Sequence, residues 1–181
     1  MSSSNDERKA LELLKNHAEL KSKLTSLTMS GDLPILDAHV HAIARKWFEL
    51  ARLHYADAAA ADVRKNPRAV YSRSYYAAYN ASKAVRYVVQ GIVSLKGDDH
   101  KKVADLPSSF PDVDSWAAKL PALYEHRLRA DYDNWSDTPT ENVLSPKECL
   151  DTSAMFLKVA GQFLLEKYEL KVWHEWVKPR N

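Results

Sequence analysis

Residues 67–90, PRAVYSRSYYAAYNASKAVRYVVQ, predict one long helix that decides the fold class. Pro67 stands at its first position after Asn66, and Gly91 and Gly97 bracket its end, in keeping with the preference of helices for Pro at the start and Gly after the end. Small and apolar side chains recur along it at helical spacing: Val70, Ser74, Ala77, Ala81, Val85, Val88 and Ile92. Because much of this stripe is small, we expect a neighbouring helix to approach it closely.

Helical signals also precede this stretch. A capping box, Ser4-x-x-Glu7, opens a helix over about residues 5–28. Leucines recur along that helix every seven residues, at Leu13, Leu20 and Leu27. Asp37 reads as the N-cap of a second helix, which ends before Pro67. The leading helix is either docked on the body or a separable arm that mediates oligomerisation.

Further segments follow the long helix. Residues 98–106 predict one or two helical turns, and a helix over 113–132 either kinks or restarts at Pro121. Residues 133–144 are polar and acidic and predict a loop. The sequence SPKE at 145–148 forms a capping box with Pro at the first helical position, so a last helix begins there.

The fold class follows from these segments. The chain has 181 residues but only four glycines, and no segment alternates in the manner of a strand. We therefore expect an all-α fold, an antiparallel helical bundle of four to five long helices plus a leading N-terminal helix. The expected division is an N-terminal arm at 1–33 and a bundle at 34–181. The pattern leaves open whether the last helix extends through Trp173 and Trp176.

Composition points to the cytoplasm. Apolar residues make up 45% of the chain and charged residues 28%, as in globular proteins. No apolar run approaches the roughly 18 residues of a membrane-spanning helix, and the N-terminus lacks the apolar region of a secretory signal. A single cysteine, Cys149, fits a reducing compartment. We expect no contact with membranes.

Charge is unevenly distributed along the chain. Residues 63–97 contain seven basic residues and no acidic one, whereas residues 105–141 contain eight acidic residues and three basic ones. At 100° per residue, one side of the long helix carries cations and rings: Arg68, Ser72, Tyr76, Tyr79, Lys83 and Arg86, flanked by Arg73 and Asn80. Cations that bind phosphates and rings that stack on bases are typical of nucleic-acid surfaces. The alternative is that this side packs against the acidic helix at 113–132, in the same chain or in a dimer mate.

Two other groups predict no chemistry. On a helix, His39 and His41 diverge by about 200°, so with Asp37 they do not form a metal site. Cys149 has no histidine or asparagine beside it that would activate a nucleophile, so we expect a packed thiol. The chain lacks phosphate-binding loop, dinucleotide and hydrolase motifs. We expect neither a metal nor a cofactor.

Three motifs in order resemble the HEPN family of helical bundles: RSYYAAYNA at 73–81, HKKV at 100–103 and LYEHRLRADY at 123–132. The residues that match the family pattern are Arg73, Tyr75, Tyr76, Arg127, Asp131 and Tyr132. The resemblance covers about residues 37–170. It implies a compact bundle that is often a homodimer, in a prokaryotic toxin–antitoxin or defence system. Many members are metal-independent RNases, and others bind nucleotides, RNA or partner nucleotidyltransferases.

The nuclease members carry an arginine followed four to six residues later by histidine. Arg127 matches that arginine, but Tyr132, Asp133 and Asn134 occupy the positions where the histidine would stand. We therefore expect a module that binds RNA or nucleotide phosphates, or a partner protein, rather than a usual RNase. One alternative is a metal-independent endoribonuclease with a rearranged site of Arg127 and His100. Another is a non-catalytic partner of a nucleotidyltransferase that modifies Tyr132.

Overall fold

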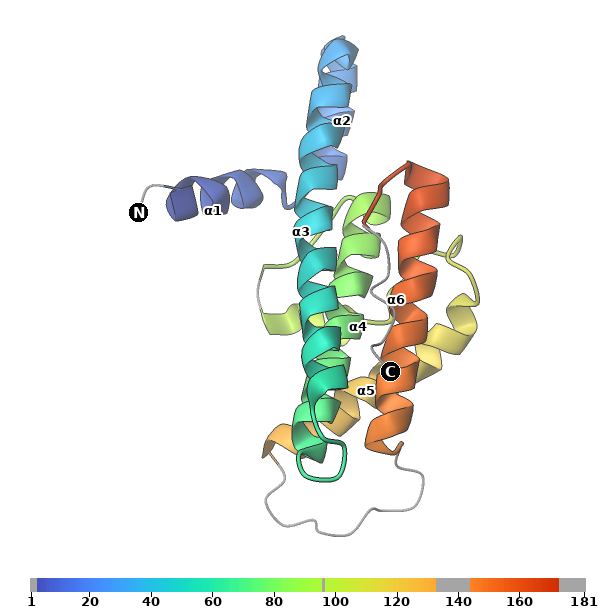
Figure 1. Cartoon of the computed structure of the whole chain (residues 1–181). Helices are drawn as coiled ribbons and strands as arrows, with labels where there is room; N and C mark the ends of the chain where they lie inside the picture. The colour runs from blue at the N-terminus through green and yellow to red at the C-terminus, as the bar shows by residue number, and fades with distance from the viewer. Residues whose placement is uncertain (1–2, 96, 133–143, 173–181) are drawn as a thin grey trace.

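The computed structural model describes residues 3–95, 97–132 and 144–172, and within these ranges its regular elements are helices (Figure 1). The α-helices are α1 (Ser3–Leu14), α2 (His17–Ser26), α3 (Leu33–Ala60), α4 (Pro67–Gln90), α5 (Val113–Tyr132) and α6 (Pro146–Tyr168). Two short 3₁₀ helices are η1 (Ser30–Asp32) and η2 (Gly97–Lys102). The expected all-α bundle is confirmed.

Helix α4 is the centre of the bundle. Consecutive helices α3 to α6 run in alternating directions, with α5 crossing behind α4 and α6 (Figure 1). Helix α4 packs against α3, α5 and α6, so it is buried on almost every side. The predicted small-residue stripe lies in the core from Val70 to Val88, while Ile92, beyond the helix, is exposed. Small side chains such as Ala77 and Ala81 let the neighbouring helices approach this crowded position.

The predicted helix ends are confirmed at several positions. Gly91 adopts the left-handed conformation, with φ of 75°, and ends α4. The Ser145 hydroxyl accepts a hydrogen bond from the Glu148 amide (3.2 Å), and the Ser145 amide donates to the Glu148 carboxylate (2.7 Å). This capping box opens α6 as expected. Pro121 lies inside an uninterrupted α5, so the helix does not restart there.

The N-terminal predictions need correction. The single helix expected at 5–28 is two helices, because residues 15 and 16 leave the helix to pair with the chain beyond α4. The Val93 amide donates to the Lys15 carbonyl (2.9 Å), and the Asn16 side chain caps α2 by accepting from the Glu19 amide (3.2 Å). The leucine repeat does not form one buried face, since Leu13 and Leu27 are exposed while Leu20 packs against the core.

Asp37 is not an N-cap. Helix α3 begins four residues earlier, at Leu33, because Pro34 fits its first turn and starts the helix there. The Asp37 carboxylate instead forms an ion pair with Lys21 of α2. Three expectations fall outside the described part of the structure: the capping side chains of Ser4 and Glu7, the loop at 133–143, and the course of the chain through Trp173 and Trp176.

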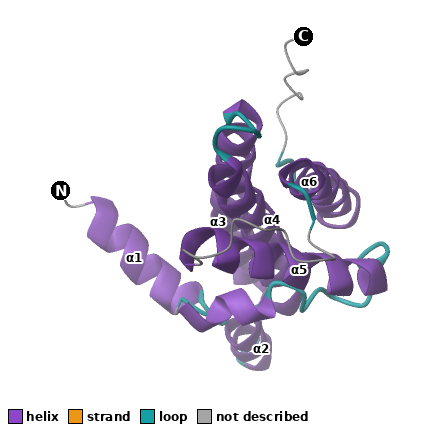
Figure 2. Ribbon diagram, turned by 90° about the horizontal axis from the view of Figure 1, so that it is seen from below, coloured by secondary structure: helices purple, strands orange, loops and turns teal. Residues whose placement is uncertain are grey.

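Helix α2 is docked on the bundle, whereas α1 projects from it (Figure 2). The His17 side chain is 2% exposed, and its Nε2 donates to the Tyr87 carbonyl (2.8 Å). The Tyr87 hydroxyl in turn donates to the Leu14 carbonyl (3.0 Å), and the Ala18 amide donates to the Gly91 carbonyl (3.2 Å). These contacts fix the start of α2 to the end of α4.

None of the described helices combines the length and the apolar character needed to cross a membrane.

Replacing Gly91 by alanine tests this docking. A Cβ atom at Gly91 would lie 2.5 Å from the Ala18 Cβ, and the residue would keep a left-handed backbone. We expect Gly91→Ala to lower the free energy of unfolding by at least about 1–2 kcal/mol, measured by chemical denaturation. Gly31→Ala is the control, because nothing lies within 4 Å of its Cβ. Equal effects of the two substitutions would contradict the docking contact.

Candidate functional site

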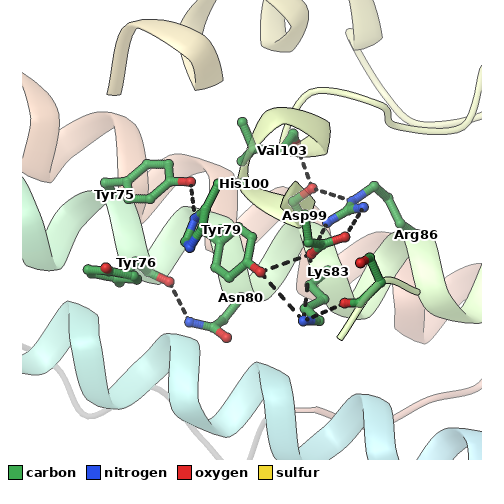
Figure 3. Close-up of polar contacts among 11 residues, drawn as sticks. Tyr75, Tyr76, Tyr79, Asn80, Lys83, Arg86, Asp99, His100 and Val103 are labelled. Carbon is green, nitrogen blue, oxygen red and sulfur yellow. Dashed lines mark hydrogen bonds and ion pairs between the residues drawn. The ribbon is translucent and has the colours of Figure 1, made fainter. Parts of the chain in front are cut away.

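A buried ion pair fixes the short helix η2 to α4 (Figure 3). Arg86 donates from Nη1 to Asp99 Oδ1 (3.1 Å) and from Nη2 to Asp99 Oδ2 (3.0 Å). The Arg86 residue is 3% exposed and Asp99 is fully buried. Two parallel bonds between planar groups set the orientation of both side chains. The turn that carries the next residue, His100, is therefore held at a defined place on α4.

Neighbouring polar groups complete this ion pair. Ser82 Oγ accepts from Arg86 Nε (3.3 Å) and donates to the Val103 carbonyl (2.6 Å), which adds a second tie between α4 and the turn. The Tyr79 hydroxyl donates to Asp99 Oδ2 (2.9 Å), and Lys83 Nζ lies 3.6 Å from the same oxygen. Each buried charge thus has partners, as burial requires.

These partners decide the protonation of Asp99. Burial alone would raise the pKa of its carboxyl group, but the hydrogen bonds and charge of Arg86, with the charge of Lys83, outweigh burial and hold that pKa below its usual value. Burial lowers the pKa of the Lys83 amine, and Asp99 opposes that shift.

The predicted basic surface is therefore wrong for the second half of α4. Lys83, Arg86 and Asn80 are turned into the bundle, because η2, α3, α5 and α6 enclose this part of the helix. The Asn80 side chain donates to the Tyr76 carbonyl (2.8 Å). The alternative, that the basic helix packs against the helix at 113–132 of the same chain, is confirmed by the packing of α4 on α5. The carboxylate that pairs with Lys83 and Arg86, however, is Asp99 of η2.

His100 lies in an aromatic enclosure beside α4. Its Nδ1 is 2.7 Å from the Tyr75 hydroxyl, and its ring stacks on Tyr79 with centroids 4.4 Å apart. The Tyr124 ring of α5 lies nearly parallel, 6.2 Å away. Burial raises the pKa of the Tyr75 phenol, so Tyr75 stays protonated and its hydroxyl forms a hydrogen bond with His100 Nδ1. Because a phenol hydroxyl can donate or accept, this contact fits both neutral tautomers of His100.

Tyr76 joins the remaining predicted site residues. Arg127 Nη2 donates to the Tyr76 hydroxyl (2.9 Å), and the Arg127 Nε lies 2.7 Å from an Asp131 oxygen. On the α3 side, the His54 ring lies 5.4 Å from the Tyr76 ring at a tilt of 31°. The His100 ring meets Tyr76 edge-on at 6.0 Å.

Arg73 completes this group from the preceding turn of α4. Its Nη1 lies 3.1 Å from His54 Nδ1, and its Nε lies 3.9 Å from an Asp57 oxygen. Because a guanidinium only donates, Nδ1 of His54 accepts and the imidazole proton resides on Nε2. Burial, and then the charge of Arg73, lower the pKa of His54. We call His54, Arg73, Tyr76, His100 and Arg127 the Tyr76 cluster.

The cluster gathers groups from α3, α4, η2 and α5. Four of its members came from the sequence motifs, and Asp131 joins them through Arg127. Tyr132 is 68% exposed at the end of α5, with its ring 5.3 Å from the Arg127 guanidinium. Arg68 is exposed near the start of α4.

Two important residues were missed by the sequence analysis. His54 has no local signal, because its partners lie on another helix, 19 and more positions away. The charge pattern could have indicated Asp99, because Asp98 and Asp99 are the first acidic residues after the basic stretch at 63–97.

The other candidate groups form no site. His39 and His41 lie on α3, and the described part of the chain holds no group of three or more metal-ligating side chains. Cys149 is buried in the first turn of α6, and burial raises the pKa of its thiol to about 12. It is therefore protonated at neutral pH.

Comparison of the chain with protein-family models, with curated proteins and with solved structures finds no match. The resemblance to the HEPN family therefore stays a prediction that rests on the three motifs.

Replacing Asp99 tests the ion pair that holds η2. Asp99→Asn leaves the buried Arg86 without a counter-charge, so we expect it to lower the free energy of unfolding by about 3–5 kcal/mol. Asp151→Asn, which removes the partner of Lys147 on the exposed surface of α6, is the control and costs below about 1 kcal/mol. Denaturation at neutral pH measures both. A similar small cost for the two variants would contradict the role of Asp99.

The same pair predicts a pH dependence. Because the pKa of Asp99 is lower in the folded chain, its contribution is complete above about pH 4 and disappears as pH falls through the folded pKa. The stability difference between wild type and Asp99→Asn therefore shrinks on acidification below that pH. Should Asp99→Asn not fold, the double variant Arg86→Met/Asp99→Leu removes both charges and regains most of the lost stability.

Proposed function

We propose that the protein is a module that binds RNA or nucleotide phosphates at the Tyr76 cluster. The observation that carries the proposal is the placement of Arg73 and Arg127, which come from different helices and are linked through Tyr76. Arg127 donates to the Tyr76 hydroxyl and lies over its ring, whereas Arg73 contacts His54, whose ring lies 5.4 Å from the Tyr76 ring. Guanidinium groups recognise phosphates through paired N–H donors. Each of these arginines has a carboxylate partner but five N–H donors, so donors remain for a ligand.

The aromatic members of the cluster are suited to stacking on the base of a nucleotide. The Tyr76 and His54 rings are both partly exposed, beside the cations. An unpaired base stacks on such rings with little regard to its identity, and the stacking contributes about 1–3 kcal/mol per base. Phosphate donors beside stacking rings are the combination that single-stranded nucleic acid requires.

Protonation favours binding over cleavage. Cleavage at a ribose 2′-hydroxyl needs a group that accepts its proton. In the free protein, His54 of the Tyr76 cluster carries its imidazole proton on Nε2, because its Nδ1 accepts the hydrogen bond from Arg73. The carboxylates of Asp57 and Asp131 lie against arginines. The guanidinium groups of Arg73 and Arg127 and the Nε2–H of His54 are hydrogen-bond donors, and donors are what a bound phosphate requires.

The HEPN resemblance supplies the setting of the proposal. The first of its three motifs contributes Arg73 and Tyr76 to the cluster, the second contributes His100, and the third contributes Arg127. A homodimer in a prokaryotic toxin–antitoxin or defence system is the expected context. The exposed Tyr132 keeps a second function open, that of a partner modified by a nucleotidyltransferase.

A metal-free binding assay tests the proposal. Labelled single-stranded RNA is incubated with the protein in chelator at about 50 and 200 mM salt, and retention and cleavage are scored together. We expect salt-sensitive retention without cleavage. Arg73→Ala and Arg127→Ala should each weaken retention about tenfold or more, and each should reduce the salt slope by about one unit.

Lys23→Ala is the matched control, since it removes an exposed cation of α2 that pairs with Glu19. It should bind RNA as the wild type does. Cleavage that is abolished by Arg127→Ala would instead establish the alternative endoribonuclease. Retention that is unaffected by both arginine substitutions would contradict the proposed site.

A further inference from the structure

His54 of α3 contacts both Arg73 and Tyr76 of the proposed site. Its Nδ1 receives the Arg73 Nη1 hydrogen bond at 3.1 Å, and its ring lies against Tyr76. Arg73 is otherwise held only loosely, because its side chain is 47% exposed and its Nε lies 3.9 Å from Asp57. Of the contacts described for Arg73, the bond to His54 is the one with hydrogen-bond geometry.

This bond exists in only one protonation state of His54. A neutral imidazole with its proton on Nε2 accepts at Nδ1, whereas an imidazolium has no acceptor. Protonating His54 therefore breaks its bond with Arg73 and places two cations side by side. Conversely, Arg73 opposes the protonation of His54 as long as the guanidinium donates its hydrogen bond to Nδ1.

We infer that His54 positions Arg73 and couples phosphate binding at the Tyr76 cluster to the uptake of one proton. A bound phosphate draws the Arg73 guanidinium away from Nδ1, because charge-assisted hydrogen bonds to phosphate are stronger than one to a neutral imidazole. The vacated Nδ1 takes a proton from solvent, and the new imidazolium is attracted to the phosphate through Nε2–H. This inference rests on the proposed function and adds to it the way in which the site responds to pH.

The groups around His54 set the direction of the coupling. Arg73 and Tyr76 face it from α4, and Asp57 faces it from the next turn of α3. Beyond the Tyr76 ring lie Arg127 and His100. In the free protein, burial and Arg73 keep the pKa of His54 low, and Asp57 opposes them only in part. A phosphate reverses the balance because it neutralises Arg73 and adds negative charge, so binding tightens as pH falls.

The first measurement is an NMR pH titration of the His54 ring in the full chain. We expect the His54 pKa to lie below about 6.5 in the free protein and to rise when a single-stranded RNA pentamer is added. Arg73→Gln should raise the pKa of His54 without any ligand. This ligand-free result tests the contact with Arg73 even if no RNA binds.

The second measurement is the affinity for the same pentamer between about pH 5.5 and 8, where coupling to one proton changes affinity by up to about tenfold per pH unit. His54→Gln keeps an acceptor for Arg73 but does not titrate. Its affinity should depend on pH less steeply than that of the wild type, by about one proton bound per RNA, and any affinity lost with the His54 ring should be the same at every pH. His54→Ala should bind more weakly at pH 8 than His54→Gln does, because alanine also removes the acceptor for Arg73. His41→Gln, on the same helix beside Asp37, is the control and should change neither.

The outcomes separate the two proposals. An unchanged pH profile in His54→Gln, with Arg73-dependent RNA binding, would overturn the role of His54 and leave the phosphate site standing. Absence of RNA binding at every pH would overturn the proposed function and the proton coupling together. If His54→Gln and His54→Ala lose the same affinity at pH 8 and the dependence of affinity on pH is unchanged, His54 has only a structural role.

Discussion

The rest of the site depends on one buried interaction, the paired hydrogen bonds between Arg86 and Asp99. They tie a short helical turn to the middle of α4, in a place where neither charge is exposed to water. Burying two charges is unfavourable unless geometry and further hydrogen bonds compensate, and Ser82, Tyr79 and Lys83 supply them. The consequence is positional, because His100 follows Asp99 directly and is carried to the tyrosines of α4.

Two kinds of charge on α4 thus have different tasks. Near its C-terminal end, Lys83 and Arg86 are satisfied inside the bundle and hold the turn in place. Near its N-terminal end, Arg73 reaches the edge of the bundle, where α3 and α5 bring His54 and Arg127 beside Tyr76. Helix α4 therefore supplies both the arginine of a structural ion pair and one of the two cations of the candidate ligand site, Arg73. Burial distinguishes the two arginines.

The sequence predicted the elements well and their environments less well. Local chemistry specifies helix ends, so the capping box at Ser145 and the glycine at Gly91 were found where the structure has them. Helical periodicity, however, assigns a residue to a side of its helix without saying what covers that side. Arg86 was expected at a surface because nothing local shows that a turn 13 residues later brings a carboxylate to it.

The candidate site shows the same limit. Arg73, Tyr76, His100 and Arg127 were identified by motifs, whereas His54 reaches them only through the packing of α3 on α4. The break at Asn16 likewise depends on a contact with Val93 and its neighbours, far along the chain. Contacts between helices, rather than propensities within them, account for what the sequence left undetermined.

The most direct test of phosphate binding at the Tyr76 cluster is NMR mapping with a single-stranded RNA pentamer. The side-chain resonances of Arg73 and Arg127, together with the rings of His54 and His100, should shift along one binding curve. Resonances of α2 around Lys23 should stay in place. Shifts that gather on another surface, or a titration that leaves both arginines unchanged, would contradict the proposed site.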